Sequence, residues 1–250
     1  MMCAGALLII LLLNLTIASQ TKEQESSAAQ AIQAAQNEVL AHPDSADVYY
    51  RLGQGYLEHW YSDAPKAAAA FLQATRLRPD YAEAHLGLAL AYDRDHRHRM
   101  QEVHPKKEIE ALKMAIRLNP DYAEAIVQLA RTYMLNETLP NLDLEKTHRP
   151  AVELLKQAIA VKPSFAGAYE ELGRAYSVLR DRTDALAAFK QAILLEPDDP
   201  GIYSLLDHYS ARFGDTEGVI ATYEQVIKGE PNNGLAQESL GHRISCNSQI

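Results

Sequence analysis

Cysteine is nearly absent from the sequence, which holds only Cys3 and Cys246 in 250 residues. Cys3 lies within the N-terminal apolar run, so a chain processed there keeps one thiol, and a single thiol forms no intramolecular disulfide. The sequence also lacks Cys-x-x-Cys pairs and the Cys/His spacing of zinc sites. A disulfide framework and a structural zinc site are therefore excluded. Cys246 is predicted to be an ordinary C-terminal residue, with intermolecular pairing in an oxidising compartment as the alternative.

Positive charge is also scarce, because 24 Lys and Arg face 33 Asp and Glu and give a formal net charge of −9. Nucleic acid is excluded as the main ligand, since neutralising phosphates needs a basic surface. Disorder of the whole chain is excluded too, because 47% of the residues are hydrophobic and supply a substantial core.

Signature motifs of common enzymes are missing: Gly-x-Ser-x-Gly, His-Glu-x-x-His, the phosphate-binding P-loop and Gly-x-Gly-x-x-Gly do not occur. We therefore predict no catalytic residue, no cofactor and no metal, and expect a protein that is not an enzyme. Two alternatives stay open. In the first alternative, the chain is an accessory subunit of an enzyme. In the second, it is an enzyme with a weak metal site on a histidine-rich insertion described below.

Residues 1–19 form an apolar segment without a charged side chain. The run Ala4–Leu13 has the length of a signal-peptide core and is short for a membrane-spanning helix. Small residues at 16–18 suggest cleavage before Ser19 or Gln20. We predict a signal peptide and export to the periplasm or the medium. The alternative is an uncleaved N-terminal membrane anchor, and membrane contact is expected only in that case.

The stretch from Pro163 to Pro197 has a clear helical pattern. Four residues at spacing i, i+3, i+4, i+7 share one face of a first helix, namely Tyr169, Leu172, Gly173 and Tyr176. After a break at 180–183, a second helix carries Ala185, Phe189 and Ala192 on one stripe and stops before Pro197. This pattern resembles the tetratricopeptide repeat, a 34-residue helix-turn-helix unit, with Tyr in place of its usual Trp. The resemblance implies an all-α, right-handed solenoid that binds other proteins.

The same pattern divides the rest of the chain, because each repeat is introduced by a proline. The prolines are Pro43, Pro79, Pro120, Pro163, Pro197 and Pro231. Five repeats are predicted, at about 43–78, 79–119, 120–162, 163–196 and 197–230. A capping helix within 20–42 precedes them, with a narrow apolar stripe of Ala28, Ala31, Ile32, Ala35, Val39 and Leu40. A half-repeat at 231–250 with Leu235, Leu240 and Gly241 follows them and ends in a frayed tail.

Small residues on the first helix are expected to let two helix backbones approach closely. Gly53, Ala89, Ala130 and Gly173 occupy this position in the first four repeats. Asp207 takes it in the fifth repeat, and Glu108 replaces the first alanine of the second helix in the second repeat. Both substitutions are expected to loosen the local packing.

Repeats two and three carry insertions between their paired helices, at 93–107 and 134–150. Both are predicted to be loops on the same edge of the array, an edge that often binds partners. The first is rich in charge, and its His96, His98, His104, Asp93 and Asp95 are the basis of the metal alternative. The second is expected to be anchored by Leu139, Leu142 and Leu144.

The partner-binding groove is expected beside the packing positions of the first helices, as the resemblance implies. The candidate residues are Tyr50, Gln54, Leu86, Leu90, Val127, Arg131, Met134, Arg174, His208 and Arg212. The early members are mostly apolar and the late ones basic. Chaperone-binding members of the family hold a terminal carboxylate with a Lys/Asn clamp, which this sequence lacks. We predict an exported scaffold whose partner is a protein or peptide with apolar and acidic segments.

Overall fold

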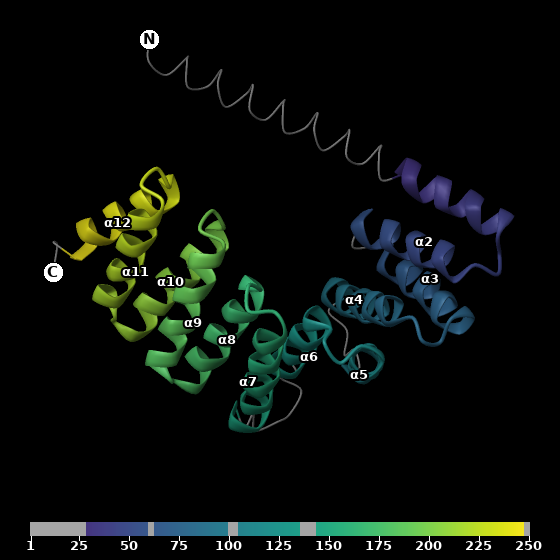
Figure 1. Ribbon diagram of the computed structural model, residues 1–250, viewed down its shortest axis with the longest axis horizontal. Helices are drawn as coiled ribbons and strands as arrows, with labels where there is room; N and C mark the ends of the chain where they lie inside the picture. Colours follow the sequence, from purple (N-terminus) through teal and green to yellow (C-terminus); the bar gives the residue numbers. More distant parts are fainter. Residues whose placement is uncertain (1–28, 60–62, 100–104, 136–143, 248–250) are drawn as a thin grey trace, which may run out of the picture. The chain divides into compact units, whose positions relative to one another are not determined.

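The computed structural model describes residues 29–59, 63–99, 105–135 and 144–247, and regular secondary structure in these ranges is helical (Figure 1). The predicted signal segment 1–19 lies outside them. None of the described helices is long and apolar enough to cross a membrane. The chain divides into two compact units, 1–119 and 120–250, which are described in turn.

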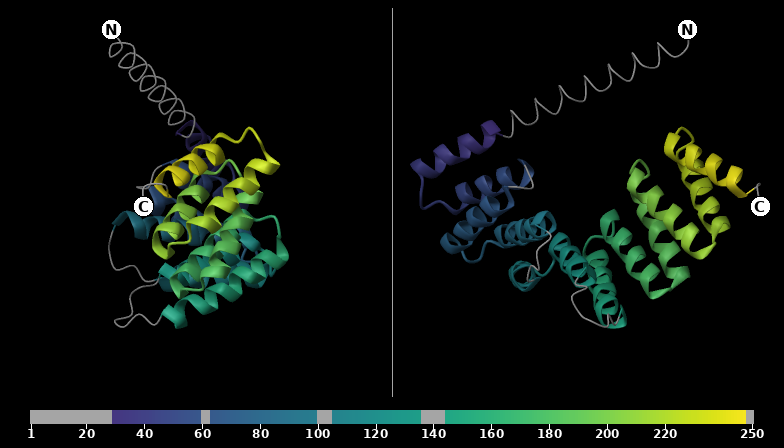
Figure 2. Two further views of the ribbon diagram at one scale, coloured as in Figure 1. Left: turned by 90° about the vertical axis from the view of Figure 1, so that its left-hand side faces the viewer. Right: turned by 180° about the vertical axis from the view of Figure 1, so that it is seen from behind.

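Paired helices build both units. Unit 1 contains a helix over 29–41, α2 (Ala46–His59), α3 (Ala64–Leu77), α4 (Ala82–Arg99) and α5 (Pro105–Leu118). Unit 2 contains α6 (Ala123–Leu135), α7 (Leu144–Val161), α8 (Ala166–Leu179), α9 (Arg182–Leu195), α10 (Pro200–Phe213), α11 (Thr216–Gly229) and α12 (Gly234–Asn247). Each predicted repeat thus holds one helix pair. Within each unit, successive helices lie side by side in chain order (Figures 1 and 2).

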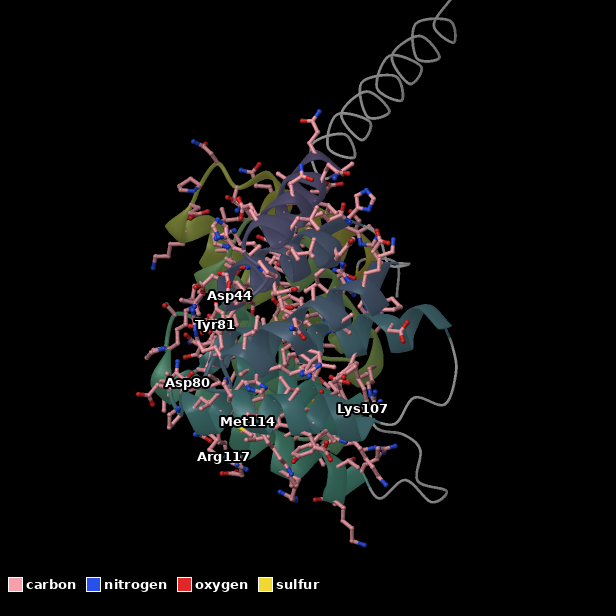
Figure 3. All side chains as sticks on the ribbon, turned by 90° about the vertical axis from the view of Figure 1, so that its right-hand side faces the viewer. Asp44, Asp80, Tyr81, Lys107, Met114 and Arg117 are labelled. Atoms are coloured by element: carbon pink, nitrogen blue, oxygen red, sulfur yellow. The ribbon has the colours of Figure 1, made fainter. Side chains whose placement is uncertain are left out.

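The turns between repeats share one backbone arrangement. The amide that follows each second helix donates to a carbonyl four residues earlier, as Lys162 does to Ala158 at 2.8 Å and Glu196 to Ala192 at 3.0 Å. The next residue is a proline, which cannot continue the helix because it lacks an N–H. In unit 1, Asp44 and Asp80 each follow the proline of such a turn (Figure 3).

Glycine and phenylalanine control the close helix contacts, as the sequence predicts. A Cβ atom added at Gly173 would lie 2.5 Å from the Phe189 ring, and one at Gly53 would lie 2.8 Å from the Phe71 ring. Phe71 is fully buried because α4 also meets it with a glycine, Gly87, which the repeat pattern does not single out. These contacts leave no room for a side chain.

The helices α10 and α11 approach each other less closely than the paired helices of the other repeats, as predicted for Asp207. Its Oδ1 accepts hydrogen bonds from the Tyr223 hydroxyl at 3.0 Å and from Arg243 Nε at 2.8 Å. Burial, followed by the nearby Asp207 carboxylate, raises the pKa of Tyr223. Side chains still fill the space between these helices, with Leu206 and Tyr223 fully buried. At the other substituted position, Glu108 is buried as well.

The two insertions were predicted to be loops. This prediction is wrong for the insertion residues that the structure describes. Both α4 and α7 have 18 residues, against 14 in most of the other helices, so 93–99 and 144–150 are helical. Extending an existing helix is easier than starting one, and an ion pair between Arg149 and Glu145 supports the added turn of α7. Leu144 is 38% exposed at the start of that turn and anchors little. Leu139, Leu142 and His104 lie outside the described residues.

The helix over 29–41 covers α2 as predicted. Ile32 and Ala35 are buried against Leu52 and Ala70, and Gln36 donates to the Tyr56 hydroxyl at 2.7 Å. The predicted apolar stripe is only partly correct, because Ala31 is exposed and Leu40 is 82% exposed. Ala28 lies outside the described residues.

Candidate protein-binding groove

In unit 1, the predicted groove residues are largely engaged with their own unit. The Tyr50 ring packs against Phe71 and Tyr81, with centroid separations of 5.8 and 5.0 Å. Gln54 donates to the Tyr50 hydroxyl at 3.0 Å. Leu86 is buried and Leu90 partly exposed. These contacts give Tyr50 a packing role within the first two repeats.

In unit 2, two hollows meet on the first helices. One, of about 230 Å³, is lined by Arg131, Met134, Leu135, His148, Glu171, Arg174 and Val178. The other, of about 310 Å³, is lined by Arg174, Ser177, Val178, Phe189, Leu205, His208, Tyr209 and Arg212. They share Arg174 and Val178 and therefore form one continuous surface along α6, α8 and α10. We call these residues the unit 2 groove.

The structure brings five of the predicted residues together in this groove: Arg131, Met134, Arg174, His208 and Arg212. Val127 is buried instead, since it packs inward one turn before Arg131. The prediction missed several lining residues, including Leu135 and Val178. The available signal was helical spacing, because each follows a predicted arginine by four residues and shares its face.

Two glutamates organise the arginines of the groove. Arg131 Nε lies 3.2 Å from Glu171 Oε1, and Arg174 lies 3.9 Å from both Glu170 and Glu171. The glutamate side chains are mostly covered, whereas half of the Arg174 side chain is exposed. Burial, reinforced by Asp199, raises the pKa of Glu170 against the opposing effect of Arg174. The covered carboxylates thus hold the guanidinium groups from the buried side of the groove, and N–H donors of the guanidinium groups stay exposed.

Polar groups at the other end of the groove are also oriented. The His208 ring nitrogen Nδ1 lies 2.6 Å from the Ser204 carbonyl oxygen. Because a carbonyl oxygen only accepts, Nδ1 carries a proton and donates to it. Arg212 is exposed, with its guanidinium 5.5 Å from the Phe213 ring centroid. The Ser177 hydroxyl oxygen is buried and has no hydrogen-bond partner within the described residues.

Apolar side chains complete the groove. Leu135 is 62% exposed at the end of α6. Met134, Val178 and Leu205 are partly exposed. The buried rings of Phe189 and Tyr209 pack edge to face beneath them, with centroids 6.2 Å apart. The groove therefore offers apolar contacts between guanidinium groups, an arrangement suited to a partner that combines apolar and acidic side chains.

A larger hollow of about 500 Å³ lies elsewhere in unit 2, between α7, α8 and α9. Its cations are already paired, because Arg149 binds Glu145 and Lys156 Nζ lies 3.3 Å from Glu153. Its larger volume alone does not favour this hollow as a binding site over the unit 2 groove. In the groove, Arg174 lies 3.9 Å from Glu170 and Glu171 and is only loosely held.

The metal alternative is not supported by the described part of the chain. No group of three or more His, Cys, Asp or Glu residues is placed there to hold a metal ion. The side chains of His96 and His98, and all of His104, lie outside what the structure describes.

Comparison with known proteins agrees with the helix pairs. The tetratricopeptide repeat family model matches residues 62–98 and 148–201. The crystal structure of MamA is similar, with 27% identity, a TM-score of 0.54, and coverage of 71% of this chain and 93% of that one. A thermophilic TPR protein of Thermus thermophilus shares 24% identity with a TM-score of 0.57, over 80% of this chain and 99% of its own. YrrB, described as a TPR protein with an unusual peptide-binding site, shares 16% identity with a TM-score of 0.52, over 84% and 98%.

Curated protein sequences gave no significant match. The helix pairs and the glycine–phenylalanine contacts define an all-α protein built of repeated helix pairs. The family model, which matches two stretches of the chain, and the fold of the solved structures support a tetratricopeptide repeat protein.

Proposed function

We propose that the protein is a scaffold without chemistry of its own, which binds a segment of a partner protein in the unit 2 groove. The tetratricopeptide fold is typical of protein–protein interaction. The observation that carries the proposal is the row Arg131, Arg174 and Arg212 on successive first helices, with exposed apolar side chains between them.

The proposed partner segment carries acidic and apolar residues. Arginine presents a planar fork of donors that suits carboxylates, and charge-assisted hydrogen bonds of this kind are stronger than neutral ones. Glu171 already holds Arg131 in place, so less side-chain entropy is lost when that arginine binds a partner. Leu135 and Val178 supply the apolar contacts.

Three labelled peptides of equal length test this proposal by fluorescence anisotropy. The first joins a leucine-rich block to a glutamate-rich block, the second replaces glutamate by lysine, and the third replaces leucine by serine. We expect binding of the first peptide alone, weakened by added salt because exposed charges are screened. In an Arg131→Glu/Arg174→Glu variant its Kd should rise at least about tenfold, since each charged hydrogen bond contributes about 1.5–3 kcal/mol.

The matched control is Lys190→Glu/Lys228→Glu, which makes the same change in net charge on α9 and α11, outside the groove residues. It should bind the first peptide like the unaltered protein. Equal weakening in both variants would contradict a role for the groove and reduce the effect to net charge.

We also propose that the protein works after export. Support comes from the apolar, uncharged segment 1–19 and the small residues that follow its core. N-terminal sequencing of the protein purified from its host should give a start at Ser19 or Gln20. A chain that still begins at Met1 in the membrane fraction would replace this proposal by the anchored form.

A further inference from the structure

The two hollows of the unit 2 groove are built in the same way, one repeat apart. The hollow of about 230 Å³ is called the first and the hollow of about 310 Å³ the second. One side of each comes from a first helix, and the equivalent residues are Arg131, Met134 and Leu135 on α6 and Arg174, Ser177 and Val178 on α8. The other side comes from the next first helix, and the equivalent residues are Glu171, Arg174 and Val178 on α8 and Leu205, His208 and Arg212 on α10.

The first hollow is apolar, and its charges are balanced within the protein. Leu135 is 62% exposed there, and Met134 and Val178 are partly exposed. Arg131 is already paired, because its Nε lies 3.2 Å from Glu171 Oε1. An acidic side chain entering this hollow would meet the negative charge of Glu171, whereas an apolar side chain would cover exposed apolar surface. The first hollow therefore favours an apolar side chain.

The second hollow has the opposite chemistry at the same positions. Leu205 stands where Glu171 stands in the first hollow, and Arg212 stands where Val178 stands. Among the described residues, none with an acidic side chain lines the second hollow. Arg212 is exposed, and half of the Arg174 side chain is exposed. Two exposed guanidinium groups beside one hollow favour a carboxylate.

The spacing of the hollows limits the conformation of a segment that enters both. They are one first helix apart, and α6 contacts α8, so the separation is that of packed helices, about 8–10 Å. A polyproline II segment places every third side chain on one side, about 9 Å apart. Side chains on one face of a β-strand are about 7 or 14 Å apart, and an α-helix is itself about 10–12 Å wide and would cover both hollows.

We infer that the groove binds a partner segment in the polyproline II conformation, with an apolar side chain in the first hollow and an acidic one, three residues away, in the second. This inference rests on the proposed function and makes its partner specific. Arg174 and Arg212 hold the carboxylate of the segment, and Leu135 covers its apolar side chain.

A series of labelled peptides tests the spacing by fluorescence anisotropy. Each carries one leucine and one glutamate in a proline-rich host, in both orders, with one, two or three residues between them. We expect the tightest binding with two intervening residues. The Kd at the other spacings should be about tenfold higher, because a misplaced glutamate loses its charged hydrogen bonds. Equal affinity at all spacings, or a different optimum, would overturn the inference.

Replacing the glutamate of the best peptide by glutamine identifies the arginine that holds it. With the unaltered protein and with Arg131→Gln, this replacement should raise the Kd about tenfold. With Arg212→Ala it should matter clearly less, since the partner charge is already gone. Arg212 is exposed, so its replacement keeps the fold. A glutamine effect that disappears in Arg131→Gln and persists in Arg212→Ala would overturn the assignment of the hollows.

The peptide that joins leucine-rich and glutamate-rich blocks separates this inference from the proposed function. If neither that peptide nor the spaced peptides bind, the groove is no binding site and both are overturned. If the block peptide binds and depends on Arg174, but the spaced peptides show no preference for spacing or for Arg212, the proposed function stands and the inference alone is overturned.

Discussion

Gly173 and Gly241 hold the same repeat position but have different surroundings. Gly173 faces the Phe189 ring, at 2.5 Å from where a Cβ atom would lie, and Gly241 faces open space. A sequence comparison gives the two glycines one role, because both follow leucine in a Leu-Gly pair. The structure separates a glycine needed for packing from one that leaves a surface free.

Replacing each glycine by alanine should therefore change stability in opposite directions. Gly173→Ala forces the Phe189 ring to move, and overpacking of this kind costs about 1–3 kcal/mol. Gly241→Ala should stabilise the protein by roughly 0.5–1 kcal/mol, because alanine restricts the unfolded chain and favours the helix. Urea unfolding at low protein concentration measures both. A loss of stability at Gly241 as large as that at Gly173 would contradict the open surface.

The last helix depends on a long-range polar contact. Arg243 of α12 reaches Asp207 of α10 with Nε at 2.8 Å and a terminal nitrogen at 2.7 Å. Asp207 also accepts from Tyr223 of α11, so one carboxylate joins three helices. A small residue at 207 would serve close packing, and Asp207 is instead compatible with the fold because α12 supplies its counter-charge.

A double-mutant cycle tests this linkage. Arg243→Ala should lower the free energy of unfolding by about 1–3 kcal/mol, because it removes a hydrogen bond and an ion pair from a partly buried carboxylate. In the Asp207→Ala background the same change should cost clearly less, since the partner is already gone. Arg212→Ala, on the exposed face of α10, should change stability by no more than about 0.5 kcal/mol. Additive effects of Arg243→Ala and Asp207→Ala would contradict the linkage.

Local patterns predicted the helices much better than the contacts that connect distant parts of the chain. Helical spacing and prolines were enough for the paired helices and for the packing of Gly53 and Gly173, because these features depend on neighbours within one repeat. The Asp207–Arg243 pair was missed, since its members are separated by a whole repeat. The extra turns of α4 and α7 were missed because charged insertions read as loops, although extending an existing helix needs no new nucleus.

For the candidate site, the sequence located part of the groove. Arg131, Arg174 and Arg212 were predicted from their place next to the packing positions. Burial of Leu86 and Val127 was not foreseen, because a position next to a packing residue lies near the boundary between core and surface. The arginines are supported by two glutamates, Glu170 and Glu171. Their role depends on side-chain distances that the repeat pattern does not contain.

At the scale of the whole molecule, partner binding is assigned to unit 2, where the groove uses α6, α8 and α10. Gly241 of α12 and Arg174 share no contacts in the described structure, so substitutions at the two positions should act independently. Gly241→Ala should therefore leave binding of the partner segment through Arg174 unchanged.

The most direct test of the central claim is quantitative recovery of partners from an extract of the native host. The unaltered protein, Arg131→Glu/Arg174→Glu and Lys190→Glu/Lys228→Glu serve as three baits, and bound proteins are quantified by mass spectrometry. We predict that the unaltered protein and the lysine variant recover the same partner, and that the arginine variant loses it. Unchanged recovery by the arginine variant would contradict binding in the unit 2 groove.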